Sequence, residues 1–448
     1  MKYPEMPPQG EYWDQSEVWP APRFRRLQWR RLRRVVRWAF DSLPFYRTRW
    51  EAAGFHPDRL THWTDLRRIP ILTKADVLGA MRNQQRWDVG LESPEQGAPA
   101  VLCMSSGTLG TCFLFLPQRW RRIRGASTLR AYCWAGLRPG MTVMTAAPAW
   151  HGASIQESYV AERVGARVVY PWGTFLPKYA GSFVDTLLAT RPDFLFVFLP
   201  ILYAMLAECR QRGLSPQDAF RSVKTVLAVG APMTPRSQAA LEQELGVDLM
   251  EGAGVSETLT AMECRFRRGH HVLVDTGLVE IVDPKTLEPL PPGQRGTLVT
   301  TSLIPHGSLY IRYNTEDVAE ILPGECPCGR TWPRLEIYDR WANAFTVRGA
   351  RRVPYDVREC LDDIPGLLGV PFAVLRTPGD MPGLRVAVQR PATQAAAAEL
   401  ETALRERVQQ RLGAPVEVVW AETLPVAWKG LVVIEEADWR RWQSQTPG

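Results

Sequence analysis

A run of hydroxyl and glycine residues after the apolar segment 100–104 is the first feature that suggests chemistry. It consists of Ser105, Ser106, Gly107, Thr108, Leu109, Gly110 and Thr111. Glycines let a backbone approach a ligand closely, free backbone N–H groups bind anions, and hydroxyls add donors without bulk. The loop therefore suits a polyphosphate, although the same composition is common in ordinary surface turns.

Cysteine and histidine side chains form a second group that could do chemistry. The tight turn Cys326-Pro327-Cys328-Gly329 presents thiols, and Cys264 and His271 lie upstream of it. Ligands of these types complete closed tetrahedral zinc sites, which hold a loop in place and perform no reaction. Unpaired cysteines in an exposed loop are the alternative. We expect the other cysteines to be small core residues: Cys103, Cys112, Cys133, Cys209 and Cys360.

The elements that must position these groups begin to alternate near residue 141. Short β-rich runs are separated by helical stretches, which predicts a parallel sheet covered by helices. The expected strands cover 142–147, 167–170, 194–199, 225–229 and 247–250. A helix over 234–245 is well signalled, because prolines stand at its start and apolar residues recur on one side.

Beyond residue 257 the pattern changes to strands separated by turn residues, which predicts a small antiparallel sheet or barrel. The last part of the chain indicates a compact α+β unit. Its expected elements are a helix near 356–361, strands near 372–375, 384–389 and 416–420, and an Ala-rich helix from Thr393. We therefore predict an α/β fold with a large N-terminal domain, residues 1–340, that holds parallel sheets, helices and a small β-barrel. A small C-terminal α+β lid domain would follow over residues 341–448.

Composition narrows the class of protein. With 45% hydrophobic and 23% charged residues over 448 positions, the chain is typical of a globular protein with more than one core. The most apolar run, 194–207, is short and contains Pro200, so we expect no membrane-spanning helix. The N-terminus lacks the basic-then-apolar order of a secretory signal, so we expect a cytoplasmic protein with reduced thiols.

The net charge of +7 raises the question of nucleic-acid binding. The densest basic run is 23–37, in which Leu32, Val35 and Val36 recur at helical spacing. This pattern favours an amphipathic helix with arginines on its solvated face, and we expect no nucleic-acid partner. The sequence does not fix the oligomeric state and leaves a homodimer open.

Several motifs together resemble the adenylate-forming superfamily, and within it the phenylacetate-CoA ligase branch, over nearly the whole chain. The opening segments 43–47, 53–55 and 69–74 look like the start of that branch. The phosphate-binding loop at 105–111 is in the expected place. Further matches are Gly230-Ala231-Pro232, Gly254-Val255-Ser256-Glu257 and the segment from Ile311 to Asp317.

The resemblance implies ATP, Mg²⁺ and CoA as cofactors and a reaction in which a carboxylate attacks the α-phosphate while pyrophosphate leaves. Glu257 would anchor Mg²⁺ against the phosphate oxygens. Gly230 and Ala231 would lie beside adenine, and Asp317 would accept hydrogen bonds from the ribose hydroxyls. Arg340 corresponds to the arginine between the two domains.

The resemblance also implies a structural zinc, because this branch often carries one in the same region, with ligands in the order Cys264, His271, Cys326 and Cys328. Residue spacing favours His271 over His270, although adjacent histidines leave an ambiguity.

Some family positions carry a different residue here. The lysine expected in the phosphate loop is Thr111, followed by Cys112 in place of proline, and an aromatic residue beside adenine is replaced by Ala253. An Asp-Asp pair after Arg340 becomes Ala342-Asn343. These changes put the grip on ATP and the domain rotation in doubt.

The C-terminal catalytic lysine of the family has an imperfect counterpart. Lys429 precedes Gly430, whereas the relatives have glycine before lysine. Lys429 remains the candidate that would neutralise charge as the adenylate forms, with a solvated surface lysine as the alternative.

The acyl pocket of the ligases corresponds to stretches that contain His151, Tyr170, Trp172 and Gly230. Flat aromatic walls suit an aryl acid, although core packing is the alternative for Tyr170 and Trp172. His151 could orient a carboxylate and is the third catalytic candidate, or could make a structural hydrogen bond.

We therefore expect ATP-dependent activation of a small, aromatic carboxylic acid, with transfer of the acyl group to CoA or another acceptor, in a specialised or biosynthetic pathway. The alternative is a diverged member that no longer forms adenylates. It would catalyse ATP-independent acyl or C–N bond chemistry or support a partner enzyme.

Overall fold

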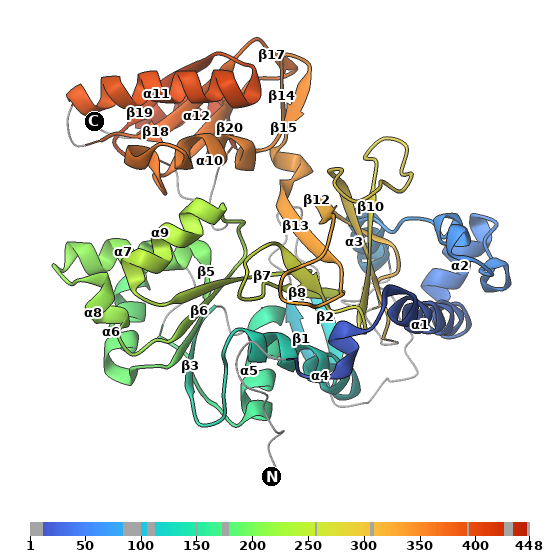
Figure 1. Cartoon of the computed structure of the whole chain (residues 1–448). Helices are drawn as coiled ribbons and strands as arrows, with labels where there is room; N and C mark the ends of the chain where they lie inside the picture. The colour runs from blue at the N-terminus through green and yellow to red at the C-terminus, as the bar shows by residue number, and fades with distance from the viewer. Residues whose placement is uncertain are drawn as a thin grey trace.

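The computed structural model describes residues 12–83, 100–104, 113–147, 151–172, 179–255, 258–304, 309–391, 394–424 and 433–445 of the chain. A large part built on one mixed sheet carries a smaller C-terminal part, drawn in orange and red at the top of Figure 1. No helix in the described ranges has both the length and the apolar character that crossing a bilayer requires.

Buried apolar strands form the parallel half of the sheet. They are β3 (Thr142–Ala146), β4 (Arg167–Val169), β5 (Phe194–Phe198), β6 (Thr225–Val229) and β7 (Asp248–Val255). Their order is β4-β3-β5-β6-β7, and every neighbouring pair is parallel. β5 is buried along its whole length, as is typical of a parallel strand covered on both faces. The predicted parallel sheet is confirmed, although β7 continues beyond its predicted end.

Helices pack against this sheet. They are α4 (Gln118–Trp134), α5 (Gly152–Val164), α6 (Ala180–Thr190), α7 (Leu199–Gln211), α8 (Pro216–Phe220) and α9 (Pro235–Leu245). At the start of α9 the Thr234 hydroxyl accepts a hydrogen bond from the Ser237 N–H at 3.1 Å. Gly246 ends the helix with a left-handed φ of 67°. These caps explain why the helix was predictable from its sequence.

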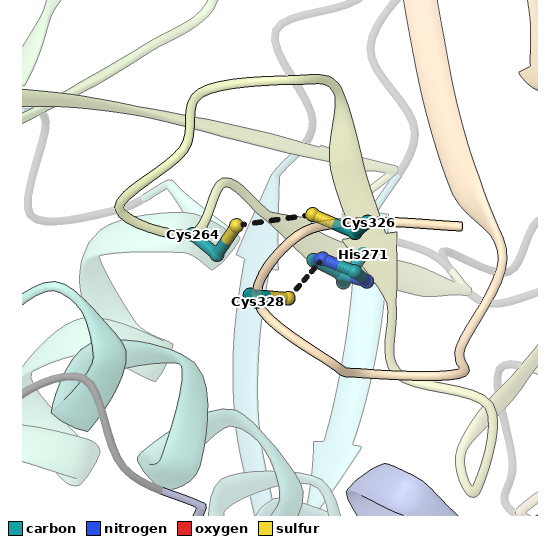
Figure 2. A group of neighbouring side chains, drawn as sticks. All are labelled: Cys264, His271, Cys326 and Cys328. Carbon is teal, nitrogen blue, oxygen red and sulfur yellow. Dashed lines mark hydrogen bonds between the residues drawn. The ribbon is translucent and has the colours of Figure 1, made fainter. Parts of the chain in front are cut away.

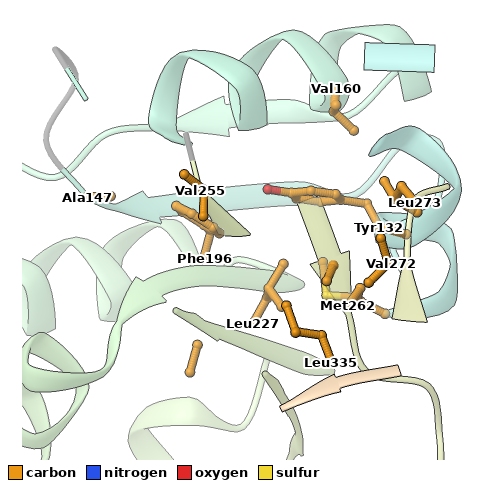
Figure 3. Packing of buried hydrophobic residues seen from close by; sticks show 14 of the residues in the cluster. Tyr132, Ala147, Val160, Phe196, Leu227, Val255, Met262, Val272, Leu273 and Leu335 are labelled. Carbon is orange, nitrogen blue, oxygen red and sulfur yellow. The ribbon is translucent and has the colours of Figure 1, made fainter. Parts of the chain in front are cut away.

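The main hydrophobic core lies where these helices meet the sheet. In Figure 3, Phe196 of β5, Leu227 of β6 and Tyr132 of α4 lie in one packed layer. Leu335, far along the sequence, belongs to the same cluster. One core therefore spans the parallel strands and the strands that follow them.

The later strands are antiparallel, as predicted, and they belong to the same sheet as the parallel strands. They are β8 (Leu259–Met262), β9 (His270–Val272), β10 (Gly277–Val282), β11 (Gly296–Ser302), β12 (Tyr313–Leu322) and β13 (Arg334–Arg340). All pair antiparallel and continue the parallel half in the order β10-β11-β12-β13-β9-β8-β7, giving an 11-stranded sheet. The sheet curls back on itself, which brings together strands that are not neighbours in its order. The Thr258 hydroxyl, just before β8, lies 2.7 Å from the Thr300 hydroxyl of β11. Within the described residues no strand pairing closes this curl into a ring.

The N-terminal segment is mainly helical. It contains α1 (Ala21–Ser42), α2 (Pro44–Ala52), α3 (Lys74–Asn83) and short 3-10 turns at Gln15–Val18, Pro57–Arg59 and Trp63–Arg68. The buried side of α1 carries apolar residues such as Leu32, Val35 and Val36. This confirms the predicted amphipathic helix. A hairpin of β1 (Ala100–Met104) and β2 (Phe113–Pro117) follows.

One buried arginine ties this N-terminal segment to the antiparallel strands. Arg312 is 2% exposed and pairs with Glu280 at 3.0 Å. Its Nη1 also donates to the carbonyl oxygen of Ile69 at 2.7 Å. The backbone of Leu72 exchanges hydrogen bonds with that of Arg312 and Asn314 at 2.9 and 2.8 Å. The opening segment 69–74 is therefore a brace for the segment 311–317.

The C-terminal part has a sheet and a core of its own. Its strands are β14 (Phe345–Val347), β15 (Ala350–Arg352), β16 (Phe372–Arg376), β17 (Asp380–Met381), β18 (Leu384–Gln389), β19 (Val416–Ala421) and β20 (Val433–Glu435). Its helices are α10 (Pro354–Asp362), α11 (Gln394–Leu412) and α12 (Glu436–Gln445), with a 3-10 turn at Pro365–Leu367. The main sheet has the order β19-β18-β16-β20. The predicted α+β character is confirmed.

We propose a domain boundary at Arg340, with domains 1–340 and 341–448. Two observations support it. The core of the C-terminal part begins at Phe345 and is a separate cluster from the main core. A short 3-10 turn, η5 (Trp341–Asn343), follows β13 at this point.

The Arg312 brace leads to a prediction about stability. Burial raises the pKa of Glu280, and the charge of Arg312 offsets part of that rise. Arg312→Ala would leave Glu280 buried without its partner, so we expect a loss of about 3–5 kcal/mol in the free energy of unfolding, measured in urea. Arg67→Ala, which removes an exposed pair with Glu288, should cost less than about 1 kcal/mol. Equal losses in the two variants would contradict the brace.

Candidate functional site

The carboxyl ends of the parallel strands bring three site residues together. Phe198 ends β5, Gly230 follows β6, and His151 begins the segment after β3. The rings of His151 and Phe198 meet edge to face with centroids 5.5 Å apart. In open α/β sheets ligands bind at this edge of the strands. The structure thus places His151 and Gly230, both predicted from the sequence, next to the ring of one phenylalanine.

Position 230 requires a glycine for two reasons. Its φ is 90°, in the left-handed region, and a Cβ at this position would lie 2.5 Å from Cδ1 of Phe198. Glycine therefore lets the chain turn closely past the phenylalanine ring. Ala231 follows and is half-buried. Their contact with adenine stays a prediction.

His151 has a structural role at the start of α5. Its Nδ1 accepts a hydrogen bond from the Ala153 N–H at 3.1 Å, which makes it the N-cap. In the neutral ring the proton then resides on Nε2. His151 is 5% exposed. The structural alternative is therefore observed, and a role in orienting a carboxylate stays a prediction.

The aromatic residues expected to line the acyl pocket are exposed in this structure. Tyr170 is 45% exposed, its hydroxyl forms a hydrogen bond with that of Ser158, and partial burial raises the pKa of Tyr170. Trp172 is 79% exposed, and its ring meets that of Tyr179 edge to face with centroids 6.2 Å apart. Their contact with a substrate stays a prediction.

Asp317 and Arg340 lie opposite each other on β12 and β13. Their Cα atoms are partners in the antiparallel register, and Nε of Arg340 lies 3.4 Å from Oδ1 of Asp317. The side chain of Asp317 is 15% exposed. The structure therefore joins the proposed ribose-binding acid to the arginine at the domain boundary, although the ribose contact itself stays a prediction.

Asp339, beside this pair, was missed by the sequence analysis. Burial, the largest cause, and the nearby charge of Asp317 together raise its pKa to about 6, although hydrogen bonds from Arg340 and Asn343 act in the opposite direction. Its Oδ1 accepts hydrogen bonds from the Arg340 N–H at 2.7 Å and from the Asn343 amide at 2.6 Å. Asn343, which departs from the family pattern, thereby holds the linker after β13.

Several predicted site residues lie outside the described residues. They are the phosphate loop Ser105, Ser106, Gly107, Thr108 and Gly110 with Thr111 and Cys112, and Glu257 and Lys429. Their roles stay predictions. The loop is bracketed by the described strands β1 and β2, which pair antiparallel.

The predicted metal ligands converge from two distant segments (Figure 2). Cys264, His271, Cys326 and Cys328 are buried, and their ligand atoms lie within 4.8 Å of one another. Sγ of Cys264 lies 3.6 Å from Sγ of Cys326, and Sγ of Cys328 lies 3.3 Å from Nε2 of His271. Ligands roughly 2.0–2.3 Å from a shared zinc ion in tetrahedral geometry have similar separations. The arrangement fits a zinc ion.

The two adjacent histidines of β9 point in different directions, because alternate residues of a strand face opposite sides. His271 joins the cysteines, and its Nδ1 lies 3.2 Å from the carbonyl oxygen of Trp332. This contact fixes the ring with Nε2 toward the thiols. His270 belongs to another group, so the geometry favours His271 as predicted.

A buried ion pair supports the cysteine turn and was not foreseen. Glu17 is fully buried, and its Oε2 lies 2.7 Å from Nε of Arg330. Burial raises the pKa of Glu17, whereas Arg330 lowers it. The guanidinium of Arg330 also stacks 4.3 Å from the ring of Trp134. Nothing in the local sequence indicates a pairing over such a distance in the chain.

The C-terminal part contacts the large part through α10. The Thr234 hydroxyl at the start of α9 donates to Oδ2 of Asp362 at 2.5 Å, and the Ser237 hydroxyl donates to the same oxygen. Arg295 pairs with Asp356 at 2.6 Å. The rings of Tyr338 and Tyr355 also meet edge to face between the two parts, so polar and apolar groups both contribute to these contacts.

The cap at His151 leads to a second prediction. His151→Ala removes the acceptor for the Ala153 N–H, so we expect a loss of about 1–2 kcal/mol in the free energy of unfolding, measured by denaturant titration. His151→Asn keeps a capping acceptor and should recover most of this loss. An asparagine variant as unstable as the alanine variant would show that the cap does not stabilise α5.

Comparison with known sequences supports the resemblance. Residues 64–303 match the model of the AMP-binding enzyme family. The chain is 28% identical to a phenylacetate-coenzyme A ligase of Thermus thermophilus, over 92% of this chain and 95% of the relative. It is 29% identical to a phenylacetate-coenzyme A ligase of Aromatoleum evansii, over 82% of this chain and 81% of the relative.

Comparison with solved structures adds the arrangement of the two parts. A 2-hydroxyisobutyryl-CoA ligase in the postadenylation state, in complex with 2-HIB-AMP, aligns with a TM-score of 0.85 at 25% identity over 98% of this chain and 96% of that one. The same ligase in its thioesterification state aligns at 0.70 and 26% identity, over 98% and 97%. This structure is therefore more similar to the postadenylation state of that relative than to its thioesterification state. The model of the AMP-binding enzyme family matches more than half of this chain, so the chain belongs to that family.

Proposed function

We propose that this protein is an acid–CoA ligase, which activates a small carboxylic acid with ATP to an acyl-adenylate and transfers the acyl group to CoA. The observation that carries the proposal is the alignment over nearly the whole chain with a CoA ligase that holds an acyl-adenylate. The phenylacetate-CoA ligases, matched over most of their own length, support the same reaction class.

The chemistry assigns roles to residues of this chain. The substrate carboxylate attacks the α-phosphorus of ATP, the bond to the β-phosphate breaks, and pyrophosphate leaves. Asp317 would orient the nucleotide through its ribose, with Arg340 holding the carboxylate in place. The loop 105–111 would bind the leaving pyrophosphate through its N–H groups and hydroxyls. Lys429 would neutralise charge at the α-phosphate, and Glu257 would hold Mg²⁺, which supplies positive charge when bound.

The acid is proposed to be small and aromatic. His151, Phe198 and Gly230 lie together at the edge where the acyl group of the ligases inserts. Tyr170 and Trp172 would add flat walls if they close over the substrate. The relatives are named for both an aromatic acid and a branched aliphatic hydroxy acid, so a panel must contain both kinds. A cytoplasmic location and a homodimer also stay predictions.

The proposed function is tested by pyrophosphate release from Mg-ATP with a panel of aryl and hydroxy acids. Asp317→Asn should raise the KM for ATP by about 10- to 100-fold, because each hydrogen bond to a charged group contributes about 1.5–3 kcal/mol. Glu316→Gln, a change of the neighbouring carboxylate, is the matched control and should leave this KM within about twofold. No pyrophosphate with any acid would overturn the proposal, and an unchanged KM in Asp317→Asn would remove the ribose assignment.

We also propose that Cys264, His271, Cys326 and Cys328 bind a structural zinc ion. The contacts of Cys328 with the Cys264 thiol and with the His271 ring lower the pKa of Cys328, so a thiolate is favoured at this position. The Arg330 N–H also donates to this sulfur at 3.4 Å. When bound, the zinc ion would cross-link the segment before β9 to the turn before β13.

Cys328→Ser should therefore lose one equivalent of zinc per chain, measured by elemental analysis, and unfold at a lower temperature. Cys209→Ser changes a buried thiol inside α7 and is the matched control, which should keep its zinc content. Zinc retained in Cys328→Ser, or absent from the parent protein after purification in zinc-containing buffer, would contradict the assignment.

A further inference from the structure

A second group of metal-ligand side chains lies on β7, β8 and β9, outside every site described above. Glu251, Glu263 and His270 are 7%, 4% and 2% exposed, and their ligand atoms lie within 4.8 Å of one another. Glu251 lies on β7, Glu263 directly follows β8, and His270 begins β9. Three neighbouring segments of the sheet therefore contribute one side chain each.

The histidine ring points a buried nitrogen into this group. Nδ1 of His270 lies 3.1 Å from the carbonyl oxygen of Leu335, which can only accept, so Nδ1 carries the proton. Nε2 consequently presents a lone pair, and it is buried without a hydrogen-bond partner. It lies 3.8 Å from Oε1 of Glu251. A backbone carbonyl that fixes the ring in this way is the usual support of a metal-ligating histidine.

The carboxylates are also held in place by the surrounding protein. Oε2 of Glu263 accepts hydrogen bonds from the Glu251 N–H and the Gln238 amide, both at 2.7 Å. Oε2 of Glu251 accepts from the Met233 N–H at 3.3 Å. Oε1 of Glu251 is thereby directed toward His270. The oxygens and the nitrogen are positioned before any ligand arrives.

The charge balance of this group calls for a cation. Among the described residues no lysine or arginine forms an ion pair with Glu251 or Glu263. Buried carboxylates are costly when they are ionised without a partner of opposite charge, and a divalent ion offsets their charge while using the lone pair of Nε2. Donors at roughly 2.1 Å from one ion lie about 3.0–4.2 Å apart, a range that includes the distance from Nε2 to Oε1.

We propose that Glu251, Glu263 and His270 form a second metal site, which takes a divalent cation that prefers nitrogen and oxygen ligands, such as Zn²⁺, Mn²⁺ or Co²⁺. The cation braces β7 against β8 and β9. The two histidines of β9 thus serve two sites on opposite faces of the strand, His271 with thiols and His270 with carboxylates. This site is independent of the proposed ligase reaction.

Cobalt(II) distinguishes the two sites, because only the thiolate site gives intense sulfur-to-cobalt charge-transfer absorption. When the chelator-treated full-length protein is titrated with cobalt(II), it should bind about two equivalents of cobalt per chain. The equivalent at the carboxylate site should add only weak d–d absorption bands. Glu251→Gln and His270→Gln should each bind one equivalent fewer while keeping the charge-transfer band. Glu242→Gln is the matched control. The Glu242 carboxylate accepts a hydrogen bond at 2.8 Å from the N–H of Leu249, which lies on β7 like Glu251, but Glu242 does not belong to the proposed metal site. This variant should keep both equivalents.

The proposal is overturned if the parent protein binds cobalt only at thiolates, as it would if a proton bridges Glu251 and His270. It is also overturned if Glu251→Gln and His270→Gln bind as much cobalt as the parent. Should a variant fail to fold, zinc X-ray absorption of the saturated parent decides the question. If both sites are filled, the average number of sulfur ligands per zinc ion should be about half the number at the thiolate site alone. An average equal to that of the thiolate site alone would overturn the proposal.

Discussion

Strand β7 is the constraint on which the rest of the large part depends. Along its first residues it pairs in parallel with β6, and from Gly252 to Val255 its other edge pairs antiparallel with β8. Because β7 has a parallel neighbour on one edge and an antiparallel neighbour on the other, it joins the parallel half of the sheet to the antiparallel half. The site residues at the ends of β5 and β6 and those on β12 and β13 therefore belong to one continuous framework.

This framework is held from outside by the N-terminal segment. The Tyr46 hydroxyl donates to the carbonyl oxygen of Leu309 at 2.5 Å and accepts from the Ile311 N–H at 3.1 Å. Arg312 adds its pair with Glu280 and its contacts to the 67–69 backbone. The opening motif of the branch thus has a physical purpose, because it fixes the backbone that leads to Asp317.

Local signals were predictable from the sequence, and long-range pairings were not. The caps of α9, the apolar run of β5 and the cysteine turn each express their structure within a few residues. The convergence of Cys264, His271, Cys326 and Cys328 was foreseen from the residue types and from the resemblance to the family, and their binding of zinc stays a prediction. Glu17 and Arg330 lie far apart in the chain, and neither has a neighbour that marks the pair. The continuity of the sheet was missed because it also depends on pairing between segments. A change in strand pattern along the sequence does not reveal that the free edge of β7 pairs with β8.

The start of α9 shares its capping groups with the C-terminal part. Asp362 accepts from both hydroxyls, Thr234 and Ser237, that stand at this helix end. The same helix α10 also packs apolar groups against the large part, since the ring centroids of Tyr338 and Tyr355 lie 5.1 Å apart. If the C-terminal part turns as a lid, as we expect, water can replace the carboxylate oxygen at the two hydroxyls, whereas the two tyrosines must expose ring surface. The observed orientation is therefore selected by a directional polar contact and stabilised by apolar burial beside it.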